Sequence, residues 1–165
     1  MDTTRKSEQT PMKHPTTVER KSDREVVITR TINGPPRLVF QAWSTAALFA
    51  QWWVPKSAGL NLLSCEMDVR VGGSYRLVFQ LEGDQTMAFF GRYLEVVPDA
   101  RIVWTNDEQG EGNGALSTVT FEAHGATTRV TLSDVYPSKE ALEAGLGSYD
   151  GMGETFDQLD ALLSA

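Results

Sequence analysis

Residues 72–99, GGSYRLVFQLEGDQTMAFFGRYLEVVPD, are the stretch that decides the fold class. From Ser74 to Leu81, apolar side chains alternate with polar ones, which is typical of a strand with one buried face. Met87–Val97 is a longer apolar run, in which Gly91 indicates a bulge or kink. Glycine, proline and aspartate mark turns before, between and after the two runs. The stretch therefore predicts two antiparallel strands joined by a short turn.

Similar patterns continue in both directions along the chain. Further strands are predicted at Arg24–Ile32, Leu60–Val71, Arg101–Thr105, Ala115–Ala123 and Thr127–Val135. Between the first two of these, apolar residues recur at helical spacing from Leu38 to Trp43 and from Leu48 to Trp53. Two short helices are therefore expected there, and Pro55 ends the second.

The last element is a helix over about 149–164, with Met152, Phe156, Leu159 and Leu163 on one face. It is the only long amphipathic element, so it must cover the apolar face of the sheet. The predicted fold class is α+β, with a curved antiparallel sheet of about six to seven strands wrapped around this helix. A curved sheet around a single helix leaves a space between them.

Composition divides the chain and excludes several classes of partner. Residues 1–23 are rich in charge and contain two prolines, so we expect a flexible polar leader before a single domain at 24–165. The net charge of −7 disfavours nucleic acid and anionic membranes. No apolar run reaches the roughly 18 residues of a membrane span, and the N-terminus lacks the apolar core of a secretory signal. We therefore expect a cytoplasmic protein.

Residues that carry catalysis or bind metals are scarce. The one cysteine, Cys65, excludes a disulfide within the chain. His14 and His124 are too few for a histidine metal site, and no serine has the context of a nucleophile elbow. The glycine pairs lack the lysine and serine or threonine of a phosphate loop. We expect no metal and no cofactor, and no catalytic motif favours an enzyme.

Five motifs in the same order resemble one known group of proteins. They are Val27–Arg30, Val39–Trp43, Gln51–Pro55, Asp68–Tyr75 and Gly91–Pro98, the last leading to Arg101–Thr105. Over residues 24–164 the chain resembles the Bet v 1/START-like (SRPBCC) superfamily, and within it the activator of Hsp90 ATPase homologue 1-like family. The resemblance implies a helix-grip fold with a hydrophobic cavity, and a possible chaperone partner. Gly151-Met152 stands where that family often has Gly-Trp, so the pocket there is expected to differ in shape.

Aromatic and soft apolar side chains are the candidate ligand-binding residues. They are Trp43, Trp52, Trp53, Met67, Tyr75, Leu77, Phe79, Phe89, Trp104, Met152 and Phe156. Since Trp52 and Trp53 are adjacent on one helix, we expect one to be core and the other a pocket wall or lip. Arg30 is either a rim residue, which we favour, or a cation inside the pocket.

Three functions remain open from the sequence. The leading one is binding of a small apolar or aromatic molecule between the sheet and the last helix. A cyclase or aromatase-type enzyme could use the same pocket with one acid–base group, and a buried charge in the pocket would favour it. A chaperone-associated interaction module is the third, by resemblance to the Hsp90 ATPase activator. The oligomeric state is not indicated.

Overall fold

The structure is a computed structural model that describes residues 14–107 and 114–164. Its eight strands form one antiparallel sheet in the order β1-β2-β8-β7-β6-β5-β4-β3. The strands are β1 (Thr16–Arg20), β2 (Glu25–Ile32), β3 (Asn61–Met67), β4 (Ser74–Gln80), β5 (Thr86–Val97), β6 (Arg101–Thr105), β7 (Leu116–His124) and β8 (Thr127–Val135). The predicted α+β fold class is confirmed.

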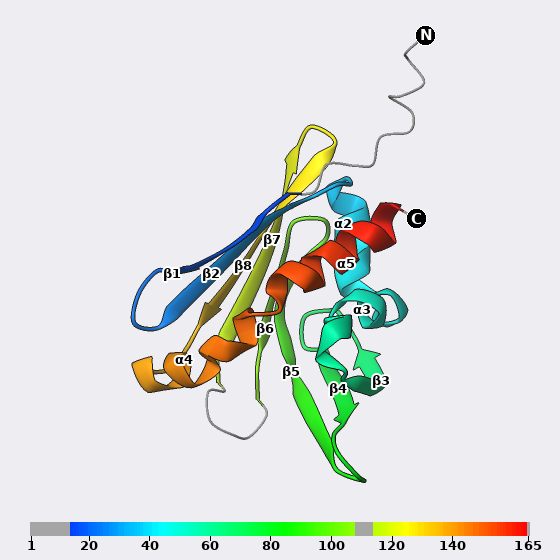
Figure 1. Cartoon of the computed structure of the whole chain (residues 1–165). Coiled ribbons are helices and arrows are strands. Elements are labelled where there is room, and N and C mark those ends of the chain that lie inside the picture. The colour runs from blue at the N-terminus through cyan, green and yellow to red at the C-terminus, as the bar shows by residue number, and fades with distance from the viewer. Residues whose placement is uncertain (1–13, 108–113, 165) are drawn as a thin grey trace.

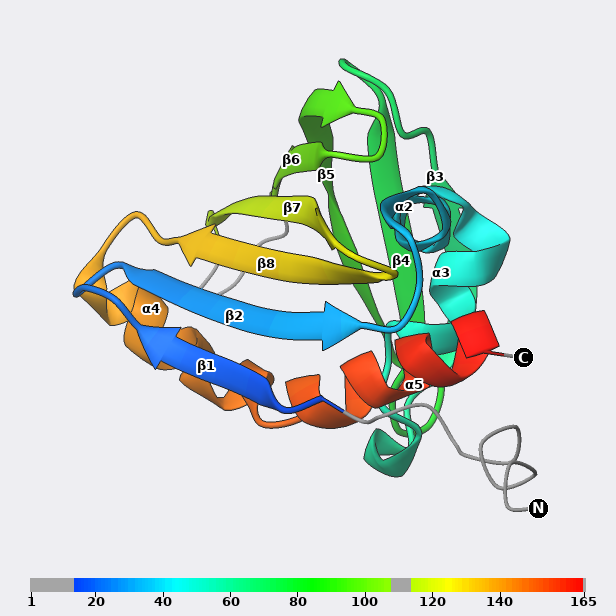
Figure 2. The same cartoon turned by 90° about the horizontal axis from the view of Figure 1, so that it is seen from above.

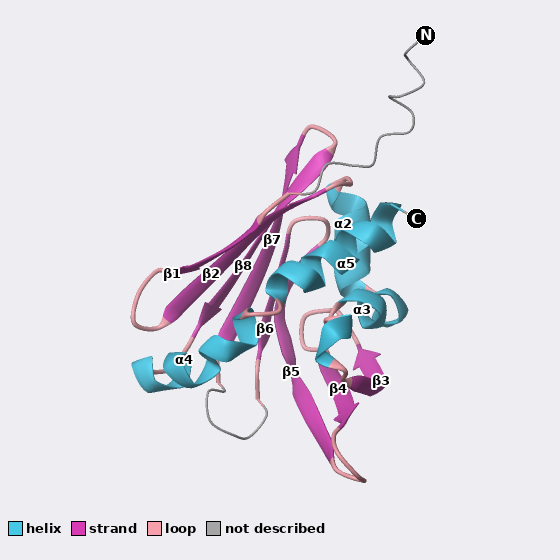
Figure 3. Ribbon diagram, in the orientation of Figure 1, coloured by secondary structure: helices cyan, strands magenta, loops and turns pink. Residues whose placement is uncertain are grey.

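Helices occupy two positions in this order. Between β2 and β3 lie α2 (Pro36–Ser44), α3 (Ala46–Trp52) and the 3-10 turn η1 (Lys56–Ala58). After β8 come α4 (Lys139–Gly145), η2 (Leu146–Tyr149) and α5 (Met152–Ser164). The sheet is strongly bent, since β1, β2, β8 and β7 run across the direction of β4 and β5 (Figure 2). In Figure 1, α5 lies across the sheet, and Figure 3 shows α2 and α3 beside its C-terminal half.

The predicted leader is wrong for residues 16–20, which form the edge strand β1. This strand pairs with β2 in register from Thr16 opposite Arg30 to Arg20 opposite Val26. Its sequence, TTVER, contains three β-branched residues in a row, which favour a strand. The prediction rested on the overall composition of residues 1–23, which is polar and charged, and did not consider these five residues separately. The rest of the predicted leader, residues 1–13, lies outside the described residues.

Arg30 on β2 links α5 to the sheet through two ion pairs. Its guanidinium lies 2.7 Å from Asp160 and 3.0 Å from Asp157, both on α5, and only 1% of the side chain is exposed. Asp160 also accepts a hydrogen bond from the backbone N–H of Asn33. The expectation of a rim residue is therefore wrong, because α5 covers this position and supplies the neutralising carboxylates.

The bulge predicted at Gly91 lies two residues later, between Tyr93 and Glu95. Gly91 is required for a different reason, which is close packing. A Cβ at this position would lie 2.0 Å from the carbonyl oxygen of Thr105 and 2.9 Å from the ring of Tyr75. Only a glycine lets the backbone of β5 approach the end of β6 and the ring of Tyr75 this closely.

Candidate functional site

A cavity of about 590 Å³ lies on the concave side of the sheet, with walls from β3 to β8, α2, α3, η2 and α5. Its walls contain all but two of the predicted site residues: Trp43, Trp53, Met67, Tyr75, Leu77, Phe79, Phe89, Trp104 and Met152. Strand periodicity explains this, since Leu77 and Phe79 are two residues apart and share a face. The cavity also includes Phe49, Leu60, Met87, Tyr93, Ile102 and Leu132, which the sequence analysis did not select.

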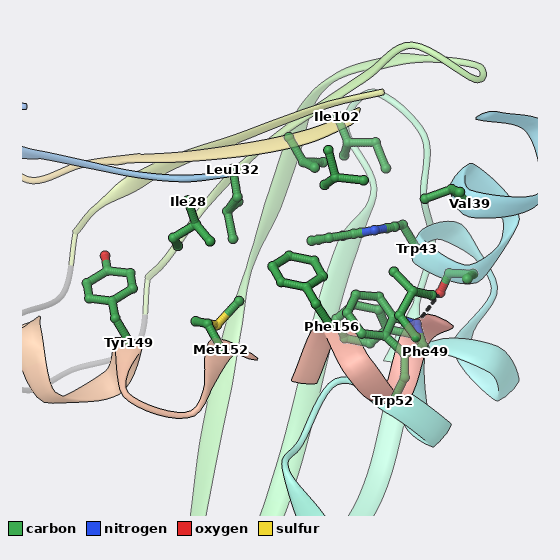
Figure 4. Packing of buried hydrophobic residues seen from close by; sticks show 14 of the residues in the cluster. Ile28, Val39, Trp43, Phe49, Trp52, Ile102, Leu132, Tyr149, Met152 and Phe156 are labelled. Carbon is green, nitrogen blue, oxygen red and sulfur yellow. Dashed lines mark hydrogen bonds between the residues drawn. The ribbon is translucent and has the colours of Figure 1, made fainter. Parts of the chain in front are cut away.

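Trp52 and Phe156 do not line the cavity, so their prediction as site residues is wrong. Both side chains are 0% exposed, and their rings stack with centroids 6.2 Å apart. The indole N–H of Trp52 donates to the carbonyl oxygen of Ala42 at 3.0 Å (Figure 4). These rings fill the interior beside the cavity, where Trp43 packs against both. Of the adjacent pair, Trp52 is core and Trp53 is cavity wall, as expected.

Tyr75 shows how the backbone positions a cavity side chain. Its hydroxyl donates to the carbonyl oxygen of Thr105 at 2.7 Å, across the gap that Gly91 leaves open. Its ring also packs against Tyr93, with centroids 5.7 Å apart. The aromatic face of Tyr75 is therefore held in the wall while its polar end is satisfied by the backbone.

A polar cluster that was not predicted from the sequence lies at one end of the cavity. The Asp134 carboxylate accepts hydrogen bonds from Ser117 Oγ at 2.6 Å and from the Tyr149 hydroxyl at 2.7 Å. The Tyr149 oxygen lies 2.6 Å from the hydroxyl of Tyr136, and Asn106 Nδ2 donates to Ser117 Oγ at 3.0 Å. All five residues line the cavity. The sequence did contain a signal, since Val130, Leu132 and Asp134 alternate along one predicted strand and the first two are apolar.

Burial dominates the electrostatics of this cluster. Desolvation raises the pKa of Asp134, although the hydrogen bonds from Ser117 and Tyr149 act in the opposite direction. The pKa of Tyr149 is also raised, first by burial and then by the negative charge of Asp134. Tyr149 therefore stays protonated at neutral pH and can serve as a hydrogen-bond donor.

Residues 14–107 and 114–164 hold no group of three His, Cys, Asp or Glu side chains that could bind a metal ion. No helix in these ranges is long and apolar enough to cross a membrane. The site is therefore an apolar, largely aromatic cavity with one polar end.

Comparisons with known proteins agree with this architecture. A crystal structure of a protein from Rhodobacter sphaeroides is similar, with a TM-score of 0.80 and 20% identity, over 90% of this chain and 97% of that one. A protein from Mycobacterium smegmatis matches with a TM-score of 0.76 and 24% identity, over 91% and 98%. One from Chromobacterium violaceum matches with 0.71 and 27%, over 87% and 99%.

A search of curated proteins found no match. A family model described as "Activator of Hsp90 ATPase homolog 1-like protein" matches residues 33–164, which is most of the chain. It includes the two helices after β2, the strands from β3 to β8 and α5, and so the whole wall of the cavity. The chain therefore belongs to the activator of Hsp90 ATPase homologue 1-like family.

Proposed function

We propose that this protein binds a small apolar or aromatic molecule in the cavity between the sheet and α5. The observation that carries the proposal is the cavity itself, whose volume of about 590 Å³ lies within the usual range of ligand pockets. Its wall is mostly aromatic and aliphatic, and Trp43, Trp53 and Trp104 all contribute. Apolar surface left uncovered in this way is stabilised when a ligand removes it from water.

A titration with naphthalene tests the proposal. We expect binding with a Kd of about micromolar, which corresponds to roughly −8 kcal/mol. Because three tryptophans line the cavity, binding should quench tryptophan fluorescence. Native mass spectrometry of the freshly purified protein should also reveal a retained small molecule.

Two matched variants locate the binding. Met87 lines the cavity and Leu94 does not, yet both lie on β5 and are similarly exposed, at 38% and 46%. Met87→Asp should weaken naphthalene binding about tenfold, because a charge is costly beside an apolar ligand. Leu94→Asp should leave it unchanged. Equal effects of both variants would place binding elsewhere. If no apolar probe binds but an Hsp90 chaperone does, the interaction-module alternative would replace this proposal.

Asp134 gives specific support to a second candidate, an enzyme of the cyclase or aromatase type. Its carboxyl and the Tyr149 hydroxyl, 2.7 Å apart in the cavity wall, form a pair that can hold and transfer a proton. The retained molecule can be incubated with wild type and with Asp134→Asn, and then analysed by mass spectrometry. A product formed by wild type alone would favour the enzyme. An unchanged molecule in both samples would favour binding without turnover.

A further inference from the structure

Among the described residues that line the cavity, Asp134 is the only one with a formally charged side chain. Among these described residues there is no lysine, arginine or histidine. None of these cations lies within 4.0 Å of the Asp134 carboxylate in the described part of the chain either. A buried carboxylate that has hydroxyl partners but no cationic partner is costly to keep ionised.

Arg30 shows how the same fold neutralises carboxylates elsewhere. Asp157 and Asp160 on α5, whose side chains are 35% and 13% exposed, share the buried guanidinium of Arg30 at 3.0 and 2.7 Å. Within residues 14–107 and 114–164, the donors to Asp134 are the hydroxyls of Ser117 and Tyr149. Each carboxylate oxygen accepts one of these bonds, so each keeps capacity for another donor. The partner that completes this charge is therefore absent from the described chain.

The surroundings of Asp134 also suit a cation. Trp104, Ser117 and Asp134 lie opposite one another on the neighbouring strands β6, β7 and β8. Since strands are about 4.8 Å apart, the Trp104 position lies roughly 10 Å from the Asp134 position. Trp104 in turn packs against Trp43, with centroids 6.0 Å apart. A flat ligand with its polar group at Asp134 would therefore extend over indole rings, which attract positive charge.

We propose that the ligand is an amine, with an apolar or aromatic body and a protonated amino group that binds the Asp134 carboxylate. This inference rests on the proposed function and adds the chemical class of the ligand. The amino group supplies the missing donors and charge, and the body fills the aromatic part of the cavity.

Three probes with one ring system test the amine preference. They are 1-naphthylmethylamine, which is a cation at pH 7, 1-naphthalenemethanol, which is a neutral donor, and 1-naphthoic acid, which is an anion. Isothermal titration calorimetry of the wild-type protein should give an amine Kd at least tenfold lower than the Kd of either other probe. Equal Kd values for all three would overturn the amine inference and leave the cavity proposal standing. Binding of none would overturn both.

A pair of charge-removing variants assigns the preference to Asp134. Asp134→Asn should bring the amine Kd to that of the alcohol. Glu122→Gln removes the same charge from an exposed side chain on β7 outside the cavity wall, and should leave the preference intact. If Glu122→Gln removes the preference equally, the effect comes from the overall negative charge and the inference fails. Circular dichroism checks that both variants fold, and the wild-type probe series remains decisive if one does not.

Discussion

The two ends of the protein interior differ in how completely side chains fill them. At one end, Trp52 and Phe156 stack within an aromatic cluster and are fully buried. At the other end, Met152 and Tyr149 border the cavity (Figure 4). Met152 belongs to α5, as Phe156 does, and Tyr149 lies just before that helix. Met152 and Phe156 are four residues apart and lie on the same side of α5. One helical turn therefore separates a packed core from an open site.

The largest expected effect on stability comes from removing the Phe156 ring from the packed end of the interior. Phe156→Ala should reduce the free energy of unfolding by about 3–5 kcal/mol, because it leaves a void among rings that cannot close in. Met152→Ala should cost clearly less, about 1–2 kcal/mol, because part of its surface already borders the cavity. Urea unfolding of both variants measures the difference. Equal losses would contradict the contrast between the two ends.

A second effect comes from releasing α5 from the sheet. Arg30→Ala leaves Asp157 and Asp160 without their buried partner and should cost about 3 kcal/mol. Arg20→Ala breaks the solvent-exposed pair with Glu143 and should cost less than about 1 kcal/mol. Thermal and urea unfolding of the two variants measure both losses of stability. A loss for Arg30→Ala no greater than that for Arg20→Ala would show that this ion pair does not hold the helix.

The smallest effect concerns pH and the polar end. Burial raises the pKa of Asp134 in the folded protein, so folding favours its protonated form. The contribution of this group is therefore most favourable below its unfolded pKa, about 3.9, and is lost as pH rises through the folded value. Asp134→Asn cannot titrate, so its stability relative to wild type should improve from pH 4 to pH 8. A constant difference across that range would contradict the raised pKa.

The fold was predictable because periodicity acts locally. The alternation of Ser74–Leu81 and the helical stripe of Met152 and Phe156 each reflect one buried face, which any sequence window reveals. Strand β1 was not predictable in the same way, since its five residues gain order only by pairing with the edge of β2.

The site was predictable in chemistry and less so in detail. Aromatic residue type pointed correctly to Trp53 and Trp104 in the wall but could not separate them from Trp52, because filling depends on packing between distant segments. The same limit applies to Arg30, whose partners lie 127 and 130 residues away. Asp134 was not predicted as a site residue, because acidic side chains usually face water and only the folded structure places this one in a cavity wall.

Methionine methyl groups offer the most direct test that the cavity binds an apolar molecule. Met67, Met87 and Met152 line it from β3, β5 and α5. With the methionine methyls labelled with ¹³C, a naphthalene titration followed by NMR should shift these three signals together, with a single Kd of about micromolar. Ring currents from a bound naphthalene would reach all three. If the three signals stay in place at saturating naphthalene, no apolar ligand enters between the sheet and α5, and the account is wrong.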